Sequence, residues 1–231
     1  MALVDDAVQK IRELIREGRL KPGARLPAEA QLAAELGMSR NPMREAVKIL
    51  AAARVLDVRQ GDGTYVTSLS PNLLLEGFGV GVDLLQGPHL LDVMEVRRML
   101  EPPATACAAT RITDSGLADV AQALAEMANS SSDAEVMIQH DLAFHRRIVQ
   151  STGNETLTAV LEGLSNHTLR ARVWRGLMDD GAAARTLAEH QSIFDALQAG
   201  DAQLAHAAAL LHVNTSEKWM RRNAGSEQPP L

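Results

Sequence analysis

The chain has 231 residues, enough for two domains with their own cores, and a formal net charge of −6. It contains no run of about 18 apolar residues, which excludes a membrane span, and an aromatic content of 3% disfavours stacking on single-stranded nucleic acid. A single cysteine, Cys107, excludes an internal disulfide, and a first segment without signal-peptide character leads us to expect a cytoplasmic protein.

The charge is distributed unevenly along the chain. Residues 1–68 hold 11 Lys and Arg against 9 Asp and Glu, a net charge of +2, whereas residues 69–231 hold 12 against 20, a net charge of −8. Only the first part has the sign that duplex DNA attracts. Because a charge of +2 is small, we expect two copies to bind DNA together as a homodimer.

The first 68 residues begin with the pattern of three helices. An amphipathic helix is predicted over residues 3–17, and a short second helix follows it. After a turn at residues 37–38, Ser39 is suited to cap a third helix. The apolar residues of this third helix recur with helical spacing and predict one buried stripe: Met43, Ala46, Val47 and Leu50.

A β-hairpin is predicted directly after the third helix. Two short strands cover residues 55–59 and 64–67, and the segment Gln60-Gly61-Asp62-Gly63 between them suits a tight turn. Helix, turn, helix and hairpin in this order are the outline of a winged helix-turn-helix, which binds double-stranded DNA.

Three polar residues of the third helix point to its DNA surface. Arg40, Asn41 and Arg44 lie off the apolar stripe, near the helix N-terminus, where a recognition helix reaches base edges and where the helix dipole attracts phosphate. Arginine has the shape for bidentate contacts with guanine or phosphate. The alternative is that these are solvated surface residues, but two arginines in this position ahead of a hairpin favour DNA binding.

Three segments of this region resemble the N-terminal domain of GntR-family transcription regulators. They are Pro22-Gly23-Ala24-Arg25-Leu26-Pro27, Leu36-Gly37-Met38-Ser39-Arg40-Asn41-Pro42-Met43-Arg44-Glu45-Ala46 and Gly61-Asp62-Gly63-Thr64-Tyr65-Val66. The resemblance implies a double-stranded DNA operator as partner. The residues expected at the DNA surface are Arg25, Ser39, Arg40, Asn41, Arg44, Gln60, Gly61 and Gly63. Ala30 stands where the family often has a DNA-contacting arginine, so the operator does not carry over from relatives.

Beyond residue 68 the chain is helical by pattern, so the fold class is mainly α. We expect a linker at 69–75, an all-helical antiparallel bundle over 76–222 that binds an effector and dimerises, and a disordered tail at 223–231. Glu101-Pro102-Pro103 is expected to kink or split the second helix of the bundle. The helices are predicted near residues 72–85, 90–110, 114–129, 133–151, 154–176, 180–199 and 201–222.

Polar residues lie among the apolar ones on three of these helices. Asp141 and His145, one helical turn apart, share an inward face, and His190 and His212 lie on the inward faces of the last two helices. A carboxylate buried without a partner is costly, and one aspartate with three histidines suits a transition-metal ion. Ordinary core or surface roles are expected for the remaining histidines: His89, His140, His167 and His206.

The order of these residues carries a second resemblance. Asp141-x-x-Phe144-His145, Glu189-His190 and His212 resemble the metal-binding form of the FadR C-terminal ligand-binding domain, the usual companion of this GntR subgroup. The resemblance covers about residues 75–222. It implies that a divalent transition metal is bound, zinc first, with nickel or another metal as the alternative. The ligands would be Asp141, His145, His190 and His212.

Arg97 also falls among inward-facing apolar residues of its helix. One interpretation is a buried ion pair with Glu101, four residues further on. The other is a clamp for an anion, because a divalent ion with three neutral imidazoles and one carboxylate, together with Arg97, gives a pocket charge of about +2. Similar domains bind organic acids, so we expect a small carboxylate as the effector.

These patterns predict a ligand-responsive transcription regulator, not an enzyme. The first alternative is a metal-dependent hydrolase or lyase, which is disfavoured because no general base accompanies the ligands, no HExxH helix is present, and Glu189 is rotated by about 100° from His190 around its helix. The second alternative is a purely structural metal without an effector.

Overall fold

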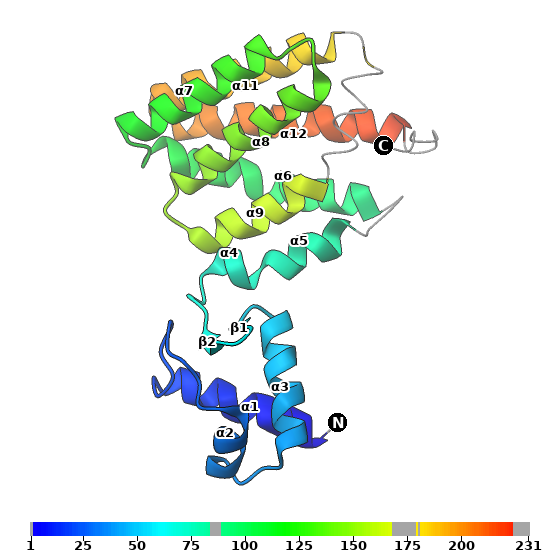
Figure 1. Cartoon of the computed structure of the whole chain (residues 1–231). Helices are drawn as coiled ribbons and strands as arrows, with labels where there is room; N and C mark the ends of the chain where they lie inside the picture. The colour runs from blue at the N-terminus through cyan, green and yellow to red at the C-terminus, as the bar shows by residue number, and fades with distance from the viewer. Residues whose placement is uncertain (1, 84–88, 168–178, 180, 224–231) are drawn as a thin grey trace. The chain divides into compact units, whose positions relative to one another are not determined.

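The computed structural model describes residues 2–83, 89–167, 179 and 181–223 (Figure 1). They belong to two compact units, Met1–Gly77 and Phe78–Leu231. The expected disordered tail lies outside the described residues except for Asn223, and so does the last part of the helix predicted over 154–176. Part of the expected linker at 69–75 forms a helical turn, α4 (Pro71–Leu74).

The first unit contains the predicted winged helix-turn-helix. Its elements are α1 (Ala2–Arg16), α2 (Glu29–Glu35), α3 (Arg40–Ala52), β1 (Leu56–Arg59) and β2 (Gly63–Val66). The two strands pair antiparallel, with Leu56 opposite Val66 and Arg59 opposite Gly63. The first helix and the two strands begin and end within one residue of their predicted ranges, because the apolar pattern and the turn residues mark them clearly in the sequence.

Helix α3 buries the stripe that its sequence predicts. Met43, Ala46, Val47 and Leu50 are all buried and join the core formed with α1 and the wing. Ser39 has the extended backbone of an N-cap, with φ −80° and ψ 157°. Within the described part of the chain its side chain makes no capping hydrogen bond, so the expected cap is present in the backbone alone.

The second unit is a bundle of long helices. They are α6 (His89–Ala109), α7 (Asp114–Asn129), α8 (Ala134–Gln150), α9 (Glu155–His167), α11 (Ala182–Gln198) and α12 (Ala202–Asn223). The largest core, around Met127, Phe144 and Ile193, is built from residues of α6, α7, α8, α11 and α12. None of the described helices is both long and apolar enough to cross a bilayer.

One expectation about helix continuity is wrong, and a second is wrong in one of its alternatives. The helix predicted over 72–85 is divided, because Leu75 (φ −95°, ψ 3°) ends α4 before α5 (Glu76–Asp83) begins. Of the kink or split expected at Pro102-Pro103, the split does not occur, and α6 continues through both prolines. Helix α6 packs along α12 and against α8, α9 and α11, and this packing outweighs the local cost of two prolines.

Helix α5 has glycine at alternate positions, Gly77, Gly79 and Gly81. The glycine in the middle faces α9, where a Cβ at Gly79 would lie 3.6 Å from the Cα of Gly163. A Cβ at Gly163 would in turn lie 3.0 Å from the ring of Phe78. Helices α5 and α9 therefore approach each other closely (Figure 1), and a Cβ at Gly163 would force the ring of Phe78 to move.

Ile11→Ala should destabilise the first unit by about 2–5 kcal/mol, because the side chain is fully buried in its core and the truncation leaves a cavity. Leu3→Ala on the same helix is the matched control. Leu3 is 66% exposed, and its loss should change the free energy of unfolding by no more than about 0.5 kcal/mol. Urea denaturation of the two variants checks this, and equal effects would contradict the burial described for α1.

Candidate metal centre and DNA interface

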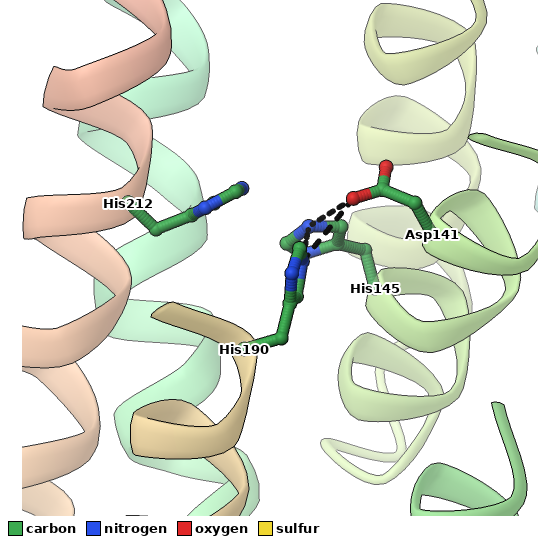
Figure 2. Close-up of side chains that lie close together, drawn as sticks. All are labelled: Asp141, His145, His190 and His212. Carbon is green, nitrogen blue, oxygen red and sulfur yellow. Dashed lines mark hydrogen bonds and ion pairs between the residues drawn. The ribbon is translucent and has the colours of Figure 1, made fainter. Parts of the chain in front are cut away.

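Four side chains from three helices converge in the bundle. Asp141 and His145 come from α8, His190 from α11 and His212 from α12 (Figure 2). One donor atom of each lies within 4.8 Å of the others. Asp141, His190 and His212 are buried and His145 is partly buried, so the four residues that the sequence singled out do meet at one point.

The facing atoms of this cluster are electron-rich. The Nε2 atom of His190 lies 3.0 Å from Nε2 of His145 and 3.2 Å from Oδ1 of Asp141. Nε2 of His145 lies 3.8 Å from the same carboxylate oxygen. Figure 2 shows these atoms pointing toward a common centre, with the ring of His212 directed at it from the opposite side.

The outer edges of two imidazole rings are held by hydrogen bonds. Nδ1 of His190 lies 2.7 Å from the main-chain oxygen of Thr186, and Nδ1 of His212 lies 2.9 Å from Oε2 of Glu189. Both acceptors require a proton on Nδ1, which assigns the Nε2 atoms as unprotonated in the neutral rings. The Nε2 lone pairs of His190 and His212 can then bind a cation.

The donor set also fits a metal chemically. Three imidazole nitrogens and one carboxylate oxygen are ligands that zinc and neighbouring transition metals accept. Burial lowers the pKa of His212, and the neighbouring His190 lowers it further, while the hydrogen bond to Glu189 acts in the opposite direction. The lowered pKa favours the neutral ring, which is the form that binds a metal.

Glu189 and Thr186 are supporting residues that sequence reasoning missed. The position of Glu189, one residue before His190, suggested that it points elsewhere, yet its carboxylate reaches the outer nitrogen of His212 on the neighbouring helix. Thr186 accepts the hydrogen bond from His190 with its main-chain oxygen, and every residue type has this group, so the sequence gives no signal for it. A glutamate beside a ligand histidine was the only available signal, because metal-binding histidines usually donate their second N–H to such a group.

Arg97 forms the buried ion pair that was one of its two interpretations. Its Nε atom lies 2.5 Å from Oε1 of Glu101, and the two residues are 1% and 5% exposed. A cavity of about 280 Å³ lies beside this pair, between α6, α8 and α9. Its walls include Glu101 and Thr105 of α6, His145 and Arg146 of α8, and Thr158, Glu162 and Ser165 of α9. His145 thus belongs both to the cluster and to the cavity wall.

Other histidines lie outside the cluster. His140 pairs with Glu126 of α7 at 3.1 Å, and His89 pairs with Asp92 at 3.3 Å. His206 is exposed on α12. The side chain of His167 lies outside the described residues.

Seven of the eight residues predicted to face DNA are exposed on the first unit, and Gly63 is partly buried. Ser39, Arg40, Asn41 and Arg44 lie at the N-terminal end of α3, and Gln60 and Gly61 lie at the tip of the wing. The free N–H groups and the dipole at this end of α3 favour an anion such as phosphate.

Arg25 has an additional role within the wing. Its guanidinium donates a hydrogen bond to the main-chain oxygen of Asp62 at the turn. The side chain occupies the space next to Gly63, where a Cβ would lie 2.6 Å from Nε of Arg25. The following amide, that of Leu26, donates to the main-chain oxygen of Thr64 at 2.8 Å. Arg25 therefore fixes the wing to the segment before α2.

Comparison with known proteins agrees with both units. Residues 3–66 match the family "Bacterial regulatory proteins, gntR family", and residues 92–215 match the FCD domain. The galactonate operon transcriptional repressor of Escherichia coli is 32% identical over 227 residues, covering 94% of this chain and 96% of that protein. LutR of Bacillus subtilis is 30% identical over 209 residues, covering 88% and 94%. The putative L-lactate dehydrogenase operon regulatory protein of E. coli is 29% identical, covering 95% and 87%.

A solved structure shows the same fold. The GntR protein of Streptococcus agalactiae superposes with a TM-score of 0.69 at 27% identity, covering 94% of this chain and 99% of that one. A winged helix-turn-helix followed by a helical ligand-binding domain defines a DNA-binding transcription regulator. The chain belongs to the GntR family, with an FCD domain as its second part. It is a regulator and not the hydrolase or lyase considered above.

Gly63→Ala should destabilise the first unit by about 1–3 kcal/mol, because the new methyl group displaces Arg25 from the wing and the backbone has φ +148°. Gly61→Ala is the matched control. It has φ +78° but no atom within 4 Å of the new Cβ, so only the backbone cost of about 1–2 kcal/mol is expected. Thermal unfolding of both variants, with Arg25 present and with Arg25→Ala, measures whether Arg25 causes the loss of stability. Gly63→Ala should destabilise the protein less when Arg25 is replaced, whereas the effect of Gly61→Ala should stay the same.

Proposed function

We propose that this protein is a homodimeric regulator whose FCD domain binds a divalent transition metal and a small carboxylate effector, and whose winged modules bind a palindromic operator. The observation that carries the proposal is the convergence of Asp141, His145, His190 and His212 with their donor atoms turned inward. A buried aspartate and the unprotonated Nε2 atoms of His190 and His212, with His145 beside them, would be stabilised by a cation. These four residues would hold it, with zinc as the first candidate and nickel or another metal as alternatives.

The effector class follows from charge and access. A bound divalent ion with one carboxylate and three neutral histidines leaves the centre with a charge of about +1 and with room for further ligands. When bound, the metal would supply a Lewis-acidic position for a carboxylate. His145 lines the neighbouring cavity, so a small molecule bound in this cavity would lie beside one of the proposed metal ligands. Two relatives are named for a galactonate operon and an L-lactate dehydrogenase operon, and both names refer to carboxylic acids.

On the DNA side, we assign base and phosphate contacts to the exposed end of α3 and to the wing. Arg40, Asn41 and Arg44 would enter the major groove, with Ser39 at the helix start and Gln60, Gly61 and Gly63 in the wing against the backbone. Arg25 would act mainly by holding the wing in place. Direct contact of Arg97 with the effector stays a prediction, because its guanidinium is already paired with Glu101.

A homodimer has an available surface on the helical domain. Helices α6 and α12 pack along each other, and both expose large apolar side chains. Val96 and Met99 of α6 are 40% and 60% exposed, and Leu204 and Leu211 of α12 are 52% and 62% exposed. Apolar residues on two adjacent helices favour contact with a second copy.

Operator affinity with and without effector tests the proposal. The metal-loaded protein should change its affinity for its own promoter DNA by about 5–150-fold when a suitable carboxylate is added, the usual range of coupling between two binding sites. Fluorescence anisotropy with a panel of small organic acids measures this. Chelation separates the alternatives: loss of the effector response in a folded protein supports the sensor, whereas unfolding supports a purely structural metal.

Glu189→Gln should weaken metal affinity by about 10–100-fold, because the amide replaces the carboxylate that accepts the Nδ1 proton of His212. Competition with a chromogenic chelator measures the affinity. Glu135→Gln, at an exposed glutamate of α8, is the control and should leave it unchanged. Equal affinities for wild type and Glu189→Gln would argue against a metal at the cluster.

A further inference from the structure

One carboxylate oxygen in the cavity wall has no assigned task. Oε1 of Glu101 is paired with Arg97, whereas Oε2 is buried and has no hydrogen-bond partner among the described residues. Leaving a buried charged acceptor unsatisfied is costly, so native structures provide a donor from protein, water or ligand. Glu101 is 5% exposed and lines the cavity of about 280 Å³, which is the space from which such a donor would come.

We infer that Glu101 recognises a hydroxyl group of the effector, so that the regulator responds to hydroxycarboxylates and discriminates against the corresponding unsubstituted acids. The inference rests on the proposed function, because it takes the carboxylate end of the effector to lie at the metal. His145 and Glu101 both line the cavity, from α8 and α6. One small molecule can therefore reach the metal beside His145 with one end and Glu101 with its hydroxyl.

Several other polar groups of the wall are already engaged. The hydroxyl of Thr105 donates to the main-chain oxygen of Glu101 at 2.9 Å, and that of Thr158 donates to the main-chain oxygen of Asn154 at 3.1 Å. The second carboxylate, that of Glu162, has the guanidinium of Arg146 at 2.8 Å. Glu162 is only partly buried, so Glu101 is the buried carboxylate of the described wall that has an oxygen without a hydrogen-bond partner.

The pairing with Arg97 selects between two kinds of donor. A ligand ammonium group would also donate to Glu101, but the nearby guanidinium repels it and already compensates the carboxylate charge. A neutral hydroxyl group gains the hydrogen bond without this repulsion. The geometry therefore favours a hydroxy acid over an amino acid of the same length.

Calorimetric titration of the full-length, metal-loaded protein tests the inference with matched acids. Propionate, lactate and alanine differ only in the substituent at C2, and butyrate with 2- and 3-hydroxybutyrate moves the hydroxyl along a longer chain. At least one hydroxy acid should bind about 10-fold more tightly than its unsubstituted parent. Equal affinities within every pair, or tighter binding of alanine than of lactate, would overturn the inference. Binding of no acid at all would instead overturn the proposed function.

Glu101→Gln should reduce the preference for the hydroxy acid to about 3-fold or less, because the amide oxygen stays with Arg97 and an N–H₂ group then faces the cavity. If this variant does not fold, the double variant Arg97→Met with Glu101→Leu replaces the buried ion pair by apolar side chains, which proteins often tolerate. Glu95→Gln, at an exposed glutamate of α6 that does not line the cavity, is the control and should keep the preference. A preference retained without Glu101, or lost in Glu95→Gln alone, would contradict the assignment.

Discussion

The second unit depends on how its polar interior is compensated. Most of the bundle is closed by apolar packing around Phe144, whose ring meets those of His145 and His190 edge-on at 5.5 and 4.6 Å. Beside this ring, Asp141, His145 and His190 bring oxygen and nitrogen atoms to within 3.0–3.8 Å of one another. His212 joins them with a donor atom within 4.8 Å of the others. A cation bound there, as proposed, would connect α8, α11 and α12 at a single point.

The sequence was most informative where periodicity and residue chemistry agreed. The stripe of α3, the hairpin and the inward position of Asp141 with its three histidines follow from spacing alone, and the structure has all of them. Prediction failed where tertiary packing decided. Pro102-Pro103 do not interrupt α6, because neighbouring helices hold it on several sides. Likewise, the reach of Glu189 to His212 depends on the distance between two helices, which no pattern within either helix contains.

Two arginines show what spacing can decide and what it cannot. Arg25 belongs to the family pattern of the DNA-binding module and is exposed, and its guanidinium also donates to the wing backbone, a contact that the sequence did not indicate. Arg97 was expected to be buried, either in an ion pair with Glu101 or as an anion clamp, and the structure has the ion pair. Spacing along one helix offered the partner of Arg97, whereas the partner of Arg25 lies 37 residues away along the chain.

The glycines of α5 lower the stability of this helix on its own. Three glycines make this helix about 2–3 kcal/mol less favourable than alanine would, so its own sequence supports it poorly. Helix α5 is stabilised instead by packing against α9, where Gly163 allows a close approach and where Val82 belongs to the same apolar cluster as Leu161 and Leu164. Helix α9 also forms one wall of the cavity. The helical conformation of α5 (Glu76–Asp83), which follows the winged module along the chain, therefore depends on packing against α9. A shift of α9 would favour unfolding of α5.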